Sequence, residues 1–192
     1  MDSLNIYSSV NNMTDLIEQV RYDHISMSRI LLLVEHELTK LGAGRNTDFD
    51  LVLESMQYMI EYSEAIHHPK EDAIMSCIYG RKHELDKFID AIREQHERMD
   101  TKSTNFYRLI QLASMDQFVK RQNIIDCGNN YILLQRNHMR LEEEKLLGEI
   151  KLMLTVEDSV RINKQFIDQK DPQIKDDFEK SFNGLYRSLI GL

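Results

Sequence analysis

Four long segments of the chain carry apolar residues spaced alternately three and four positions apart, and each of these stripes contains a histidine. Such spacing places the apolar residues on one face of an α-helix. With only two prolines and seven glycines among 192 residues, little in the sequence would break these helices. We therefore predict an all-α protein with four long helices, at about residues 14–41, 48–80, 82–113 and 116–154.

The histidines of the four stripes lie at similar distances from the predicted turns. His24 lies 18 residues before Gly42 and His67 lies 20 residues after Thr47. At ~1.5 Å per residue, both are about 27–30 Å from the first turn. The same count around the other turns brings His96 and His138 to within about one or two helical turns of that level. In an antiparallel up-down-up-down four-helix bundle, the four imidazoles would meet in one layer of the core.

Two glutamates accompany these histidines on the same helix faces. Glu71 follows His67 by four residues and Glu142 follows His138 by four, which is about one helical turn. Buried carboxylates without a counter-charge are very unfavourable, and metal cations would neutralise them while binding the imidazole nitrogens. The predicted metal ligands are His24, His67, Glu71, His96, His138 and Glu142.

The mixture of ligand types limits the metal. Imidazole together with carboxylate suits iron, manganese or zinc, and no thiolate lies in the predicted layer. Six side chains exceed the four ligands of a typical zinc site and fit two ions. We expect two histidines on each ion, with Glu71 and Glu142 bridging, which leaves coordination positions for a small ligand.

Three further residues have more than one interpretation. His68 points about 100° away from His67 around the helix, so it is either an alternative ligand or a group that contacts a ligand. Asp100, four residues after His96, is an extra oxygen ligand, an acceptor for a ligand histidine or simply polar. Tyr131 is a core residue or a donor to a bound small molecule.

Pro69 follows His67 and His68 directly. A proline inside a helix leaves the carbonyl four residues earlier, here that of Ala65, without its partner and bends the helix. The bend either re-aims a ligand or is a tolerated kink.

The bulk properties exclude several classes of function. A net charge of −8 and a pI near 5.4 argue against a nucleic-acid-binding protein and give no support to binding an anionic membrane. The longest apolar run, Ile30 to Val34, is too short to span a bilayer, and the first fifteen residues lack the features of a secretory signal. Cys77 and Cys127 form no CxxC pair, so reduced thiols in a cytoplasmic protein are expected.

The chain divides into three parts. Residues 1–13 are a lead-in, residues 14–155 form the predicted bundle, and residues 156–192 form a helical extension. Within the extension we expect a short helix at 157–170, a linker from Asp168 to Pro172 and an amphipathic helix from Gln173 to Ile190. This last helix is predicted to cap the bundle or to pair with a second copy, giving a homodimer.

The same residues resemble the hemerythrin-like, cation-binding HHE family. The segment from His67 to Asp72 resembles the family's HHPKE signature, and Asn137 to Glu144 resembles its second H-x-x-x-E element. Asp23-His24 and Gln95-His96 are similar to its single-histidine elements. The resemblance implies an antiparallel bundle with a non-haem di-iron centre, bridged by an oxo or hydroxo group and bound by the six predicted ligands. Manganese or zinc would be substitutes for iron.

The pattern also departs from one branch of that family. Oxygen-carrying hemerythrins have two histidines four apart on the third helix, and here Asp100 stands at the second of these positions. Gln95 stands where many relatives have glutamate. The ligand set is more similar to bacterial di-iron proteins linked to iron-sulfur cluster repair and nitrosative stress.

The expected function is a di-iron protein that binds or reacts with O2, NO or peroxide, for sensing or for stress protection. The alternative is iron storage, delivery or sensing without turnover of a small molecule. A third interpretation is an oxidase or reductase, for which the sequence identifies no substrate pocket and no catalytic residue.

Overall fold

Nine consecutive helical segments build the structure, a computed structural model that describes residues 3–166, with side chains from Leu16 onward. Every regular element in this part of the chain is a helix. The segments are α1 (Ser3–Gly42), α2 (Phe49–Tyr58), the π-helix η1 (Met59–His67), α3 (His68–Ile78), α4 (His83–Ser114), α5 (Arg121–Leu141), the π-helix η2 (Glu142–Leu146), α6 (Leu147–Met153) and α7 (Val156–Gln165).

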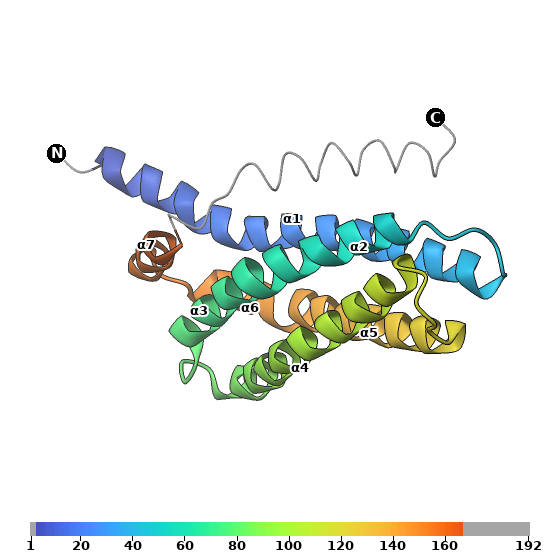
Figure 1. Cartoon of the computed structure of the whole chain (residues 1–192). Helices are drawn as coiled ribbons and strands as arrows, with labels where there is room; N and C mark the ends of the chain where they lie inside the picture. Colours follow the sequence, from blue (N-terminus) through green and yellow to red (C-terminus); the bar gives the residue numbers. More distant parts are fainter. Residues whose placement is uncertain (1–2, 167–192) are drawn as a thin grey trace.

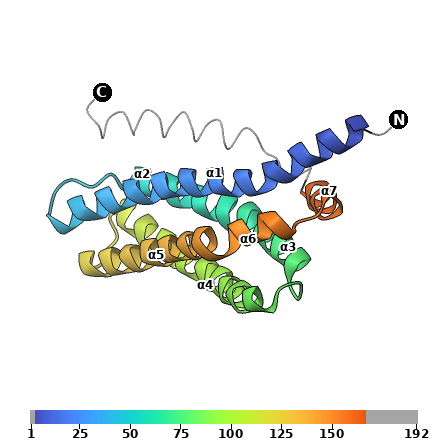
Figure 2. The same ribbon diagram turned by 180° about the vertical axis from the view of Figure 1, so that it is seen from behind.

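These segments form four long antiparallel rods, which confirms the predicted four-helix bundle. The run α2–η1–α3 is one rod and α5–η2–α6 is another. Figure 1 shows the α1–α2 and α4–α5 connections at one end of the bundle and the α3–α4 connection at the other. From behind, Figure 2 shows α5 and α6 running beneath α1. The additional C-terminal helix α7 packs against α1 and α3.

Two predicted helix starts were wrong. The first helix begins at Ser3 rather than Thr14, because no proline or glycine interrupts the intervening residues. The fourth rod begins at Arg121 rather than Asp116. Asp116 has a φ of 55°, which ends α4, and Lys120 is still extended with a ψ of 123°. The short helix predicted at 157–170 is α7, which ends at Gln165.

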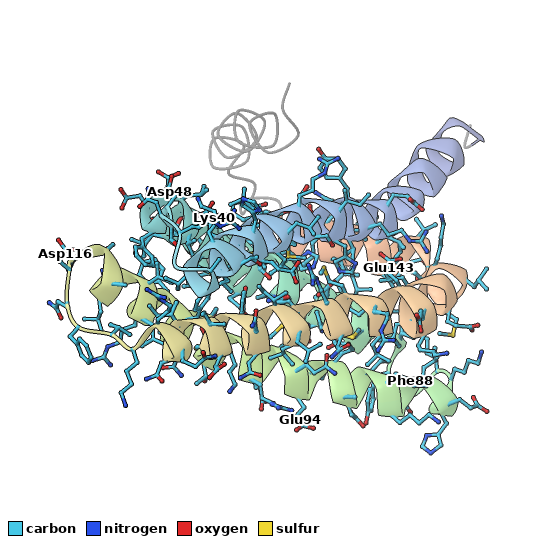
Figure 3. The ribbon with its side chains drawn as sticks, turned by 90° about the vertical axis from the view of Figure 1, so that its right-hand side faces the viewer. Lys40, Asp48, Phe88, Glu94, Asp116 and Glu143 are labelled. Atoms are coloured by element: carbon cyan, nitrogen blue, oxygen red, sulfur yellow. The ribbon has the colours of Figure 1, made fainter. Side chains whose placement is uncertain are left out.

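Side-chain hydrogen bonds hold the turn between α1 and α2. Asp48 caps α2, with its carboxylate accepting from the Leu51 amide at 3.0 Å. The Asp48 amide donates to Glu37 at 2.8 Å, and Lys40 donates to the same carboxylate at 2.7 Å. Figure 3 shows Lys40 and Asp48 together at this end of the bundle. This network fixes the register between the first two rods.

Two apolar clusters fill the core, and the predicted histidine layer lies between them. On α1, Val20 belongs to the first cluster and Met27 to the second, with His24 between. On α4, Ile92 belongs to the first cluster and Phe106 to the second, and His96 lies between them along the helix. The two rods containing π-helices also pass from the second cluster to the first around their histidines. The four rods therefore change cluster at one level, as the helix-length count predicts.

Gly128 allows three helices to approach closely within the second cluster. A Cβ atom at this position of α5 would lie 2.5 Å from Leu38 Cδ1 and 2.8 Å from Phe106 Cζ. We expect Gly128→Ala to reduce the free energy of unfolding by about 1–3 kcal/mol, because the Phe106 ring has little room to move. Urea unfolding of both proteins measures the difference.

Gly148 provides the matched control for this substitution. It lies on α6, and a Cβ atom there meets nothing within 4 Å. Gly148→Ala should stabilise the protein by up to about 1 kcal/mol, since alanine is the better helix former. Equal effects of the two substitutions would contradict the close packing around Gly128.

Within residues 3–166, no helix is both long enough and apolar enough to cross a membrane. The linker from Asp168 to Pro172 and the predicted helix from Gln173 to Ile190 lie outside the described residues, and so does the predicted dimer contact.

Candidate metal centre

The six predicted ligands come from all four rods and lie together in the buried polar layer. Their exposed fractions range from 0 % for His138 to 8 % for His96. His24 comes from α1 and His96 from α4, whereas each of the other two rods supplies one histidine and one glutamate. The structure thus brings together every residue of the predicted set, which are His24, His67, Glu71, His96, His138 and Glu142.

Glu71 faces two pairs of histidines with its two oxygens. Its Oε1 lies 3.2 Å from His24 Nε2 and 3.1 Å from His67 Nε2. Its Oε2 lies 3.5 Å from His96 Nε2 and 3.9 Å from His138 Nε2. A carboxylate in this position can bridge two cations, one beside each histidine pair.

Glu142 lies across the same two groups. Its Oε2 is 3.3 Å from His24 Nε2 and 3.3 Å from His138 Nε2, so it contacts one histidine of each pair. Groups of potential ligand atoms within 4.8 Å of one another form on both sides. One comprises His24, His67 and Glu71, and the other comprises His68, Glu71, His96 and His138. The arrangement suits two ions better than one.

Acidic side chains outside this centre orient three of its four predicted histidine ligands. Nδ1 of His24 is 3.0 Å from Glu143, Nδ1 of His67 is 3.3 Å from Asp23, and Nδ1 of His96 is 3.0 Å from Asp72. A carboxylate on Nδ1 directs the Nε2 lone pair of a neutral imidazole towards the centre, as in many metal sites. Figure 3 shows Glu143 on the side of the bundle where α1 passes the last rod.

The prediction from sequence missed these acidic partners. Asp23, Asp72 and Glu143 each adjoin a predicted ligand in the sequence, which is the only local signal for them. Glu64 was missed as well, although it precedes His68 by four residues and its Oε2 lies 3.1 Å from His68 Nδ1. The four-residue spacing that identified Glu71 and Glu142 would have found it.

Both glutamate-bearing rods change to a π-helix beside the centre. The segment η1 ends at His67, and η2 begins at Glu142. The His68 amide donates to the Ser63 carbonyl, five residues earlier, directly before Pro69. π-Turns inside α-helices are frequent at functional sites. Pro69 thus adjoins a widened turn that places two consecutive histidines in the core.

The three residues with open interpretations differ in their surroundings. His68 is 2 % exposed and lies within the second ligand group. Asp100 is exposed and belongs to neither group. The Tyr131 hydroxyl accepts from Gln135 at 3.3 Å, and its ring packs near Phe106 in the apolar core. These contacts favour a core role for Tyr131.

Unpartnered polar atoms show that cations fit this centre. Five buried atoms that face the centre have no hydrogen-bond partner. They are Nε2 of His67, His96 and His138, and Oε2 of Glu71 and Glu142. Some of these atoms lie close to one another. Each unsatisfied buried polar group costs about 1–3 kcal/mol. These atoms are the donor types that bind iron, manganese or zinc, so cations would satisfy all of them at once.

Without metal, protons take part of that role. Burial alone would lower the pKa of His24, but Glu142, Glu143 and Glu71 raise it to about 12. Burial would also lower the pKa values of His96 and His67, but neighbouring carboxylates raise that of His96 to about 10 and that of His67 to about 9. Protons and metal ions therefore compete for the same nitrogens.

His68 behaves in the opposite way. Burial and the positive charge of His96 hold the pKa of His68 well below its usual range. Burial also raises the pKa of Glu64 to about 7, with a further contribution from the charge of Asp100. His68 is therefore a neutral imidazole.

An open groove of about 620 Å³ lies on the surface between α1 and α5 and has one predicted ligand, His24, in its lining. Its lining includes His24, Ser28 and Met139, with four arginines around them. Ile25 and Leu32 in this lining are 52 % and 57 % exposed. The groove gives a small molecule an apolar approach to the His24 side of the centre.

Comparison with known proteins agrees with this geometry. The model of the family described as Hemerythrin HHE cation binding domain matches residues 15–150. No curated protein and no solved structure matches the chain.

Proposed function

Because the chain belongs to the hemerythrin HHE cation-binding family, we propose that it holds a pair of iron ions that bind or react with O2, NO or peroxide. The physiological role would be sensing or protection in the cytoplasm under oxidative or nitrosative stress. The observation that carries the proposal is the position of Glu71, whose two oxygens face different histidine pairs.

The chain's own residues would bind, orient and shield the ions. Glu71 and Glu142 would bridge them, and His24, His67, His96 and His138 would complete the sites. A pair of irons held by these residues would supply the electrons for reaction with O2, NO or peroxide. The outer carboxylates would fix the imidazole orientations, and the apolar clusters above and below the layer would limit access of water.

The test begins with protein purified without oxygen. Metal analysis and Mössbauer spectroscopy should find two coupled irons per chain, and addition of O2 or NO should produce new charge-transfer absorption. One zinc per chain, or a spectrum that neither gas changes, would overturn the proposal.

Iron delivery is less compatible with the same geometry. Delivery requires release of the ion, whereas the six predicted ligands are at most 8 % exposed and come from four rods. We therefore expect little transfer of iron to an apo acceptor over the time in which the loaded protein reacts with NO. Rapid transfer would favour the delivery function.

The groove should control how fast a small ligand arrives. Ser28 is an exposed residue of its lining. We expect Ser28→Trp to lower the association rate for O2 or NO about tenfold, with metal content and final absorption unchanged. Stopped-flow absorption measures the rate.

Leu152→Trp provides the control, since Leu152 is 83 % exposed and is not part of the groove lining. If the Ser28→Trp variant bound O2 or NO at the same association rate as the control, the groove would be excluded as the entry route.

A further inference from the structure

His68 is a second buried histidine beside the predicted ligand His67. One of its ring nitrogens lies within 4.8 Å of ligand atoms of Glu71, His96 and His138. Its ring stacks on His96 with 4.3 Å between centroids and meets the edge of His138 at 5.2 Å. We propose that His68 is a metal ligand and supplies the third imidazole to the ion that His96 and His138 bind. This inference rests on the two-ion centre proposed above.

His68 has the same type of outer partner as three of the predicted ligand histidines. Its Nδ1 faces the Glu64 carboxylate at 3.1 Å, as the Nδ1 atoms of His24, His67 and His96 face carboxylates. Donation from Nδ1 to the carboxylate leaves the lone pair on Nε2. That nitrogen lies 3.2 Å from the Ser63 hydroxyl, a neutral group whose proton can turn to another acceptor.

The π-helix explains how two consecutive residues reach one centre. Successive side chains of an α-helix point about 100° apart, which would turn one of the pair away from the core. Bonds between residues five apart widen the turn in η1 and reduce this angle. As a result, His67 and His68 are 1 % and 2 % exposed.

The additional ligand makes the two ions unequal. With both glutamates bridging, the ion beside His96 and His138 has five protein ligands, whereas the ion beside His24 and His67 has four. More coordination positions therefore remain on the ion beside His24 and His67. The groove opens at His24, so we expect the small ligand to bind on that side.

A count of bound imidazoles tests the proposal on the unmodified chain. In the Co(II)-loaded protein, each ligating imidazole contributes one strongly shifted N–H proton signal that disappears in D2O. We expect five such signals. Four signals with two bound ions would overturn the role of His68 and leave the proposed function standing, whereas failure to bind two ions would overturn the proposed function itself.

Substitution identifies which signal belongs to His68. His68→Phe keeps a ring between its neighbours but removes both nitrogens. We expect four signals and a loss of affinity for one ion greater than about 100-fold, beyond the ~10–100-fold typical of residues that only orient a ligand. Five signals in this variant would overturn the proposal, as would a loss of less than ~10-fold.

Two further variants complete the experiment. His36→Phe changes an exposed histidine and should leave all five signals and both affinities intact. If far-UV circular dichroism shows that His68→Phe does not fold, His68→Gln replaces it, since its amide can keep the Glu64 contact. The His68→Gln variant should also lose one of the five shifted N–H signals. If all five signals remained, His68 would not be a ligand.

Discussion

Replacing Glu71 by alanine should reduce the bound metal from two ions per chain to fewer than one. Each of its oxygens faces a different histidine pair, so the substitution removes a ligand from both ions. Loss of a group that merely orients a ligand costs about 10–100-fold in affinity, and loss of a bridging ligand should cost more. Plasma emission analysis after dialysis against iron-free buffer measures the stoichiometry.

Two other substitutions make this result specific. Glu71→Gln keeps the size of the side chain and removes its charge, so it separates loss of a ligand from loss of packing. This variant should also bind fewer than two ions. Glu144→Ala changes an exposed glutamate in η2 and should retain two ions. If Glu71→Ala and Glu71→Gln both kept two ions, the bridging position of Glu71 would have no part in metal binding.

The level of the histidine layer could be predicted from sequence because long helices have a fixed rise and the turns are short. Counting residues from Gly42 and Gly80 to the histidines of the apolar stripes was sufficient, and the apolar clusters change at that level in every rod. The cap at Asp48 was predictable for a similar reason, since it depends on local hydrogen bonding.

The π-helices could not be predicted from the periodicity. A spacing of three and four assumes α-helical turns throughout, and η1 and η2 depart from them at the points where the ligands lie. For this reason the sequence placed His68 away from His67, whereas the structure buries both. The partners of the histidines depend on contacts between rods, such as the one between His96 and Asp72, and sequence spacing alone does not specify these.

Removing the metal with a chelator should lower the melting temperature by about 8–16 °C for one ion. An ion held at a thousand times its dissociation constant stabilises the folded state by about 4 kcal/mol. For a chain of this length, 1 kcal/mol corresponds to roughly 2–4 °C. Differential scanning calorimetry of iron-loaded and chelated protein measures the difference, and equal melting temperatures would show that the centre holds no metal in the folded chain.

The difference in melting temperature between iron-loaded and chelated protein should increase as the pH rises from neutral to about 9. In the metal-free protein, the pKa values of His67 and His96 are raised to about 9 and about 10, above the unfolded value of about 6.5. Their protonation therefore stabilises the folded metal-free protein fully below pH ~6.5, and this contribution is lost as the pH rises through the folded pKa values. Histidines bound to metal are already deprotonated, so the loaded protein has no such contribution to lose. A melting-temperature difference that stays constant or shrinks over this range would mean that protons and metal do not share these nitrogens.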